Sequence, residues 1–303
     1  MTITVIQPAP FMTVQDRGRR RHRSAGVPQS GAMDWLALAA ANSSVANRTD
    51  AAAIECALGG LILRFDAAMS FAIGGARVEA SLSGIPVVND CLIRAKRGDE
   101  LKVNAILSGR FYYLALAGGV DVPEILGSRS TYLPGAFGGF NGRRIQAGDT
   151  LPVLVPEKPG QASAQKRFLT NPESRGLVRV LRGDQSALFS AELWRTFLES
   201  PFRVTTASDR TGYRLAGPDL SHDSAELPSE GACPGAVQLP PDGQPIVLMA
   251  DAPTVGGYPK IAVVITADLP ALAQCTPGET VSFAETTTEE AEGALRALTG
   301  HYD

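Results

Sequence analysis

The sequence predicts a mainly β protein with a few helices, organised as two β-barrel domains. Short apolar runs of strand length recur between Gly, Asp and Pro turns over residues 61–117, a spacing typical of a barrel or a sandwich. Residues 152–176 shift in composition to Pro, Lys, Gln and Ser, as in a linker. The order of turns and strands around Gly84 recurs around Gly243, which indicates a duplicated barrel.

In the N-terminal half, residues 2–7 predict a first strand, and a polar loop follows over residues 15–31. This loop is rich in arginine and glycine, as functional or disordered loops are. Asp34 can cap a helix that continues to about Ala46, and the alanine-rich run from Ala37 to Ala41 favours this helix. Further strands are expected over residues 61–65, 69–73, 77–82, 86–88, 92–95, 100–103 and 112–117.

Beyond the linker, residues 177–181 predict a strand, and apolar residues at helical spacing predict a helix over 187–198. Two strands follow at 245–250 and 261–265. Both are apolar on successive residues, so both faces of each should be buried. Two further helices are expected, over residues 268–274 and from a capping-box pattern that begins at residue 287.

The composition argues against several functional classes. A net charge of −3 over 303 residues gives no basis for binding nucleic acid or an anionic membrane. The first residues do not resemble a signal peptide, and no apolar run reaches the ~18 residues of a spanning helix, so we expect a cytoplasmic protein. The few Cys and His residues lack metal-ligand spacing, so no metal site is predicted. The sequence also lacks the glycine-rich phosphate-loop motif of nucleotide-binding proteins.

The strongest candidates for chemistry lie between the two apolar runs of the C-terminal half. Asp251 ends the first run and Lys260 precedes the second, with Gly256 and Gly257 between them. A lysine at the mouth of a buried strand is desolvated, and such an ammonium can donate a proton or stabilise an oxyanion. Asp251 would orient Lys260 or act as a base. The alternative is a hairpin with a surface ion pair of little energetic value.

Residues 208–215 place an acid, two arginines and a tyrosine around one glycine. If the segment is extended, Arg210 and Arg214 point to the same side, with Tyr213 between them. Two guanidinium groups on one face suit a carboxylate ligand. By composition alone, a solvated edge strand is the simpler interpretation.

Glu230 and Gln238 complete the candidates in this half. Glu230 precedes a glycine at a turn, and Gln238 is a lone amide among apolar neighbours. A buried amide must find hydrogen bonds. Gln238, Asp251 and Lys260 either converge at one barrel mouth or form a satisfied structural network.

Arg129 lies in a second glycine-rich region, residues 118–139. One interpretation is a long surface loop. The other is a ligand-contacting loop in which Arg129 meets a carboxylate or a phosphate.

Five motifs together resemble one protein family. They are TVQDRGRRRHRSAGVPQSGAMDWLALAAANSSVAN (13–47), AAAIECALGGLILRF (51–65), YLALAGGVDVPEILGSRSTYLPGAFGGFNGRRIQAGDTLP (113–152), SDRTGYRLAGPDL (208–220) and GAVQLPPDGQPIVLMADAPTVGGYPKIAVVI (235–265). The sequence resembles the allophanate hydrolase subunit 2 family, also called the KipA-like family or the family of the 5-oxoprolinase C subunit. This family includes the carboxyltransferase region of urea carboxylase. The resemblance implies that the predicted domains, residues 1–160 and 175–303, are cyclophilin-like β-barrels with a cleft between them.

The resemblance also implies amide or lactam chemistry in a multi-protein complex. The chain is most similar to the C subunit of an ATP-dependent 5-oxoprolinase, in which 5-oxoproline is opened to L-glutamate. ATP would act in the complex, and the partners would be a KipI-like protein and a LamB/YcsF-like protein as the other two subunits. The catalytic candidates are then Lys260 and Asp251, and the substrate-binding candidates are Arg210, Tyr213, Arg214, Glu230, Gln238 and Arg129.

Two other functions remain open within the resemblance. One is the carboxyltransferase subunit of a biotin-dependent urea or amide carboxylase. The sequence lacks the A-M-K-M pattern of a biotinylation site, so biotin would be carried by another protein. The other is regulatory, as an antagonist of a KipI-like inhibitor of a kinase.

Overall fold

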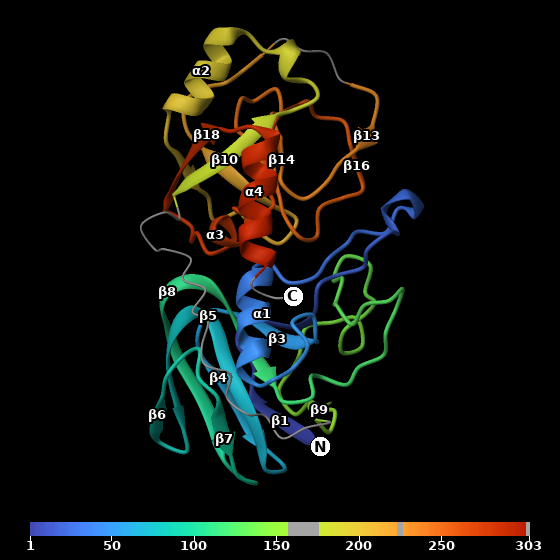
Figure 1. Cartoon of the computed structure of the whole chain (residues 1–303), viewed down its shortest axis with the longest axis vertical. Helices are drawn as coiled ribbons and strands as arrows, with labels where there is room; N and C mark the ends of the chain where they lie inside the picture. Colours follow the sequence, from blue (N-terminus) through green and yellow to red (C-terminus); the bar gives the residue numbers. More distant parts are fainter. Residues whose placement is uncertain (157–175, 223–226, 301–303) are drawn as a thin grey trace. The chain divides into compact units, whose positions relative to one another are not determined.

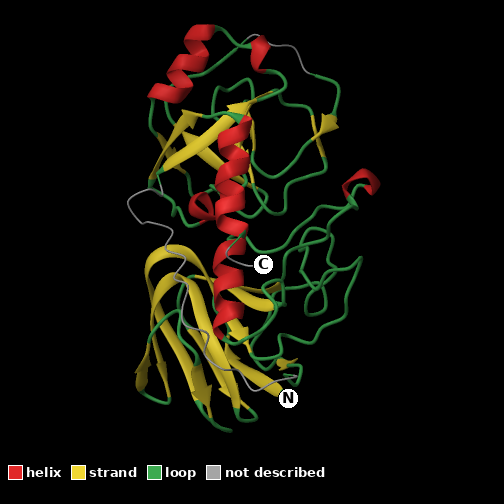
Figure 2. Ribbon diagram, viewed as in Figure 1, coloured by secondary structure: helices red, strands yellow, loops and turns green. Residues whose placement is uncertain are grey.

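The computed structural model describes residues 1–156, 176–222 and 227–300. The chain divides into two compact units, one made of Met1–Arg20 and Ser30–Phe168, the other of Arg21–Gln29 and Leu169–Asp303. The predicted domain boundary falls on residues 157–175, which lie outside the described residues. The mainly β prediction is confirmed, since strands dominate the first unit and the second contains a closed barrel of strands beside its helices (Figure 2).

The first unit is built on one nine-stranded antiparallel sheet. Its order is β2-β3-β8-β4-β1-β9, and β5 pairs with β6, β7 and β8. The strands are β1 (Thr2–Gln7), β2 (Phe11–Gln15), β3 (Ala53–Ala57), β4 (Leu61–Phe65), β5 (Met69–Leu82), β6 (Ile85–Val87), β7 (Ile93–Ala95), β8 (Glu100–Leu116) and β9 (Thr150–Pro152). The long strands β5 and β8 run side by side and curl together (Figure 1).

Strands β5 and β8 each join two strands that the sequence analysis had separated. Gly75 and Gly109 have positive φ values, 91° and 88°, and the register between the two strands shifts between Gly75 and Arg77. These irregularities are β-bulges, which bend a strand without ending it. The predicted breaks were wrong because a glycine inside an apolar run signals either a turn or a bulge.

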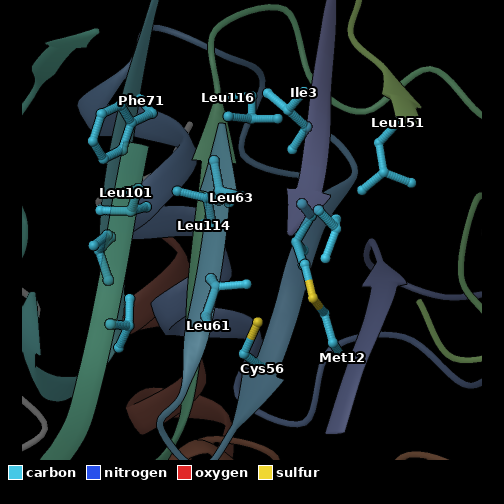
Figure 3. Packing of buried hydrophobic residues seen from close by; sticks show 14 of the residues in the cluster. Ile3, Met12, Cys56, Leu61, Leu63, Phe71, Leu101, Leu114, Leu116 and Leu151 are labelled. Atoms are coloured by element: carbon cyan, nitrogen blue, oxygen red, sulfur yellow. The ribbon is translucent and has the colours of Figure 1, made fainter. Parts of the chain in front are cut away.

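Helix α1 (Trp35–Ser44) begins as predicted, with the Asp34 side chain accepting a hydrogen bond from the Ala37 N–H at 2.9 Å. The N–H of Asp34 donates to Tyr113 Oη at 2.8 Å, and this hydroxyl donates to the buried Glu55 carboxylate at 2.7 Å. The start of the helix is thereby anchored to β3 and β8. In the core of this unit, apolar side chains from β1 to β5, β8 and β9 meet (Figure 3).

The second unit contains a closed seven-stranded barrel in the order β10-β17-β14-β15-β12-β11-β18. Its strands are β10 (Leu177–Arg182), β11 (Phe202–Val204), β12 (Gly212–Ala216), β14 (Ala236–Gln238), β15 (Ile246–Leu248), β17 (Lys260–Val264) and β18 (Thr280–Glu285). Only β10 and β18 pair in parallel among these strands. A separate two-stranded ribbon is formed by β13 (Glu230–Gly231) and β16 (Val255–Gly256).

The helices of this unit are η1 (Arg23–Ala25), η3 (Ser186–Leu188), α2 (Ala191–Glu199), α3 (Leu269–Ala273) and α4 (Thr288–Thr299). The predicted helix over 187–198 is divided into η3 and α2, because Ser190 caps α2 by accepting the Leu193 N–H. The capping box predicted for the last helix is present between Thr287 and Glu290. Among the described residues, no helix is long and apolar enough to cross a membrane.

Substitution of Phe197, on α2, tests the packing of the second unit. Its side chain is fully buried and stacks on Phe283 with ring centroids 4.5 Å apart. We predict that Phe197→Ala lowers the free energy of unfolding by about 3–5 kcal/mol, because it removes a large buried ring. Leu188→Ala, at a half-exposed position, should change it by less than about 0.5 kcal/mol. Denaturant unfolding measures both values. Equal losses of unfolding free energy in the two variants would contradict the burial of Phe197.

Candidate functional site

Strands β14 and β17 place two polar side chains of the second unit next to each other. Gln238 ends β14, Lys260 begins β17, and the two are cross-strand partners at a bulge in the β14–β17 pairing. Cross-strand partners project to the same side of a sheet. Both side chains are buried, with 6% of each residue exposed.

The Lys260 ammonium is neutralised by Glu230. Nζ donates to Glu230 Oε1 at 2.6 Å and to the Gly231 carbonyl at 3.3 Å. A buried ammonium requires such a counter-charge, because burial alone strongly disfavours its charged form. The two partners differ in exposure, since 40% of the Glu230 side chain is exposed but only 7% of the Lys260 side chain. The predicted desolvation of Lys260 is therefore present, with a partner that still reaches solvent.

The β13–β16 ribbon brings the Glu230 carboxylate to the lysine. In this ribbon Glu230 pairs with Gly256. A Cβ atom on Gly256 would lie 2.5 Å from Nε2 of Gln238, so a side chain at this position would require the Gln238 amide to move. The ribbon, Gln238 and Lys260 form one cluster, which we call the Lys260 cluster and define as Glu230, Gln238, Gly256 and Lys260.

Asp251 pairs with Arg210 and not with Lys260. Arg210 donates from Nε to Oδ2 of Asp251 at 2.8 Å and from Nη2 to Oδ1 at 3.0 Å. Both residues are about 95% buried, and the Asp251 N–H donates to the Arg210 carbonyl at 2.8 Å. The predicted Asp251–Lys260 pair was wrong because a carboxylate matches the two-pronged guanidinium better than a single ammonium.

The prediction that Arg210 and Arg214 share a face was also wrong. Arg210 precedes β12 in a turn, where Asp209 accepts the N–H groups of Thr211 and Gly212, so strand alternation does not apply to it. The Arg214 residue is exposed on β12. Tyr213 is fully buried and donates its hydroxyl to the Ala273 carbonyl at 2.7 Å, so it anchors α3 to the barrel.

Arg129 belongs to the first unit, where its side chain is held by its own loop. Nε donates to the Val122 carbonyl at 2.8 Å, and Nη1 donates to Glu124 at 2.5 Å. Its backbone N–H donates to the Asp16 carboxylate at 2.6 Å. These contacts account for its orientation, and a substrate-binding role for Arg129 stays a prediction.

Arg23 is a contributor that the sequence analysis did not single out. Its guanidinium donates to the carbonyls of Ala232 and Pro253, the latter at 3.0 Å. These two carbonyls lie directly after β13 and before β16, so Arg23 ties together the two segments of the ribbon. Burial lowers the pKa of Arg23, and nearby Cys233 partly offsets this effect. The sequence of the arginine-rich loop does not indicate which of its arginines contacts residues more than 200 positions away.

The family comparison agrees with the resemblance seen in the sequence. The model of the family "carboxyltransferase domain, subdomain A and B" matches residues 25–285. The chain belongs to this carboxyltransferase family.

Similar members of the carboxyltransferase family fall into two groups. The C subunit of the Escherichia coli 5-oxoprolinase is 39% identical and that of the Haemophilus influenzae enzyme 38%, each match covering 95% of this chain and 93% of the relative. The crystal structure of the K. lactis urea amidolyase matches with a TM-score of 0.90 and 30% identity, over 100% of this chain and 20% of that one. Relatives of the first group therefore match along nearly their whole length, whereas the second contains this fold as one part of a much longer chain.

The two buried cations that the structure describes in the second unit, Arg210 and Lys260, differ in what they can do. Arg210 is locked in a fork with a carboxylate that is itself buried, as in a structural pair. The partner of Lys260 is half-exposed, so a ligand oxygen can approach the ammonium by displacing or joining Glu230. No group of three or more His, Cys, Asp or Glu side chains that could hold a metal ion occurs in the described part of the chain.

The structural role of the Arg210–Asp251 pair can be tested by unfolding. We predict that Asp251→Ala lowers the free energy of unfolding by about 3–5 kcal/mol, because it leaves the Arg210 charge buried without this partner. The double change Arg210→Met with Asp251→Leu should recover most of that loss, since both charges are removed together. A small loss in Asp251→Ala, within about 0.5 kcal/mol, would contradict a buried pair.

Proposed function

We propose that this chain is the C subunit of an ATP-dependent 5-oxoprolinase complex, which opens the lactam of 5-oxoproline to L-glutamate. The observation that supports this most strongly is the match to two relatives named as the C subunit of 5-oxoprolinase, over 95% of this chain and 93% of theirs. This name implies that the relatives work in a multi-subunit enzyme. The proposed partners are a KipI-like protein and a LamB/YcsF-like protein.

The chemistry proposed for Lys260 follows from its surroundings. A lactam carbonyl is a poor electrophile, and ATP supplies its activation in the complex. The sequence carries no phosphate-loop motif, so we assign ATP binding to the complex and not to this chain alone. The Lys260 ammonium, held in a mostly buried position, would stabilise negative charge on the carbonyl oxygen as water attacks. Glu230 is the counter-charge of Lys260 and, being half-exposed, can move aside for the substrate.

Biotin-dependent carboxyl transfer is the second candidate function. It is favoured by the fit to the K. lactis urea amidolyase, whose TM-score of 0.90 covers the whole of this chain. In that case biotin would arrive on another protein, and the Lys260 ammonium would stabilise the enolate-like oxygen of an amide acceptor. Genes encoding a biotin carboxylase and a carrier protein next to this one would favour this function over 5-oxoproline hydrolysis.

We predict that the isolated chain does not hydrolyse 5-oxoproline with ATP, whereas the complex reconstituted with its KipI-like and LamB/YcsF-like partners does. The reason is that the activating nucleotide is assigned to the complex. Glutamate release, measured with each protein alone and with all three together, checks this. Robust turnover by the pure chain would overturn the assignment.

Lys260→Met tests the proposed role of the ammonium. The side chain keeps its length and loses its charge, and the Glu230 carboxylate left behind is 40% exposed and can be hydrated. We therefore predict a folded protein, with turnover of the reconstituted complex reduced roughly a hundredfold. Lys102→Met, at a half-exposed lysine of the first unit, is the matched control and should leave turnover unchanged. Near-normal turnover in Lys260→Met would exclude Lys260 as the charge-stabilising group.

A further inference from the structure

Gln238 is a buried residue whose carboxamide forms no hydrogen bond with the part of the chain that the structure describes. The residue is 94% buried. Neither polar atom of the carboxamide belongs to the fully buried side-chain atoms that lack a partner in the described part of the chain, so water or a ligand can reach the amide. The Lys260 ammonium lies on the same side of the sheet.

Gly256 leaves space in which this amide lies against the ribbon. Nε2 of Gln238 lies so close to Gly256 that a Cβ there would be 2.5 Å away. The amide is thus packed directly against the backbone of the ribbon that carries Glu230.

A primary carboxamide presents a donor and an acceptor on one edge. Its complement is an amide whose N–H and C=O lie on the same side, because the two groups can then form a pair of parallel hydrogen bonds. Ring closure forces this cis arrangement in a lactam, and a urea has it in every conformation. An ordinary peptide bond is trans and does not present this edge.

We propose that Gln238 recognises the cis-amide edge of the substrate, accepting the substrate N–H and donating to its C=O. The same carbonyl oxygen is then directed toward Lys260, where charge develops. Gln238 is in this account a specificity-determining residue that selects cyclic amides and ureas against molecules lacking either group. The inference rests on the proposed function only in taking 5-oxoproline as the natural cis amide.

The experiment measures the binding of two matched pairs of probes to the full chain and to the reconstituted complex. The first pair is 5-oxoproline and N-methyl-5-oxoproline. The second is 2-imidazolidinone, a cyclic urea, and its 1,3-dimethyl derivative. Methylation removes the N–H and leaves the carbonyl. Dissociation constants from ligand-observed NMR give a preference ratio for each pair.

The wild-type protein should prefer the unmethylated member of at least one pair by about tenfold or more, because a site built for a substrate N–H discriminates against its loss. Gln238→Met should bind that member about 10- to 100-fold more weakly and lose the preference, since two buried hydrogen bonds disappear. Gln238→Glu keeps the shape and the acceptor, replaces the donor by a carboxylate oxygen and adds a negative charge, so it should weaken binding but retain part of the preference for the N–H. Gln146→Met, at an exposed glutamine of the first unit, is the control and should match the wild type.

The outcomes separate this inference from the proposed function. If the imidazolidinone pair shows a preference that depends on Gln238 while 5-oxoproline is neither bound nor hydrolysed, the inference stands and the proposed function fails. If the complex containing Gln238→Met hydrolyses 5-oxoproline normally, the inference fails and the proposed function stands. A wild-type protein without preference in either pair, or folded Gln238 variants that retain the full preference, would overturn the inference.

Discussion

The burial of a positive charge at Lys260 is the constraint on which the polar cluster of the second unit depends. Burial removes water from a lysine at the first position of a barrel strand, and a carboxylate close by offsets that cost. Glu230 supplies that carboxylate at 2.6 Å, and it can do so only because the β13–β16 ribbon folds back beside β17. Arg23 holds the segments of this ribbon together, and Gly256 leaves space for Gln238.

The second buried cation, Arg210, shows why charge alone does not identify a functional group. Its guanidinium and the Asp251 carboxylate satisfy each other in a fork from which both are excluded from solvent. Such a pair fixes the chain after β15 but offers a ligand little. Lys260 has a smaller, less directional head group and a partner that reaches solvent. The difference in exposure of the two carboxylates, and not the identity of the cations, makes Lys260 the better candidate for chemistry.

The sequence predicted those features of the fold that depend on interactions between residues close in the chain. The caps at Asp34 and Thr287 and the strand at residues 2–7 depend on neighbouring residues, and all three were predicted. Strand β3 was not predicted, because its alanines and Glu55 have little strand propensity, and its place in the sheet is decided by pairing with β2 and β8.

The candidate site could be predicted only in part, because its contacts are long-range. The burial of Lys260 followed from the apolar run after it. The pairing of Lys260 with Glu230, 30 residues earlier, could not be predicted from local sequence. Asp251 was predicted as the partner because it flanks the same loop as Lys260. The role of Arg23 depends on contacts with Ala232 and Pro253, which no local pattern announces.

A crystal structure of the chain, alone or in its complex, with bound 5-oxoproline would test the central claim most directly. The account predicts the lactam carbonyl oxygen within hydrogen-bonding distance of Lys260 Nζ, in a site that also contains Gln238 and Glu230. Density for 5-oxoproline at another site, with the Lys260–Glu230 pair unchanged and unoccupied, would contradict the account.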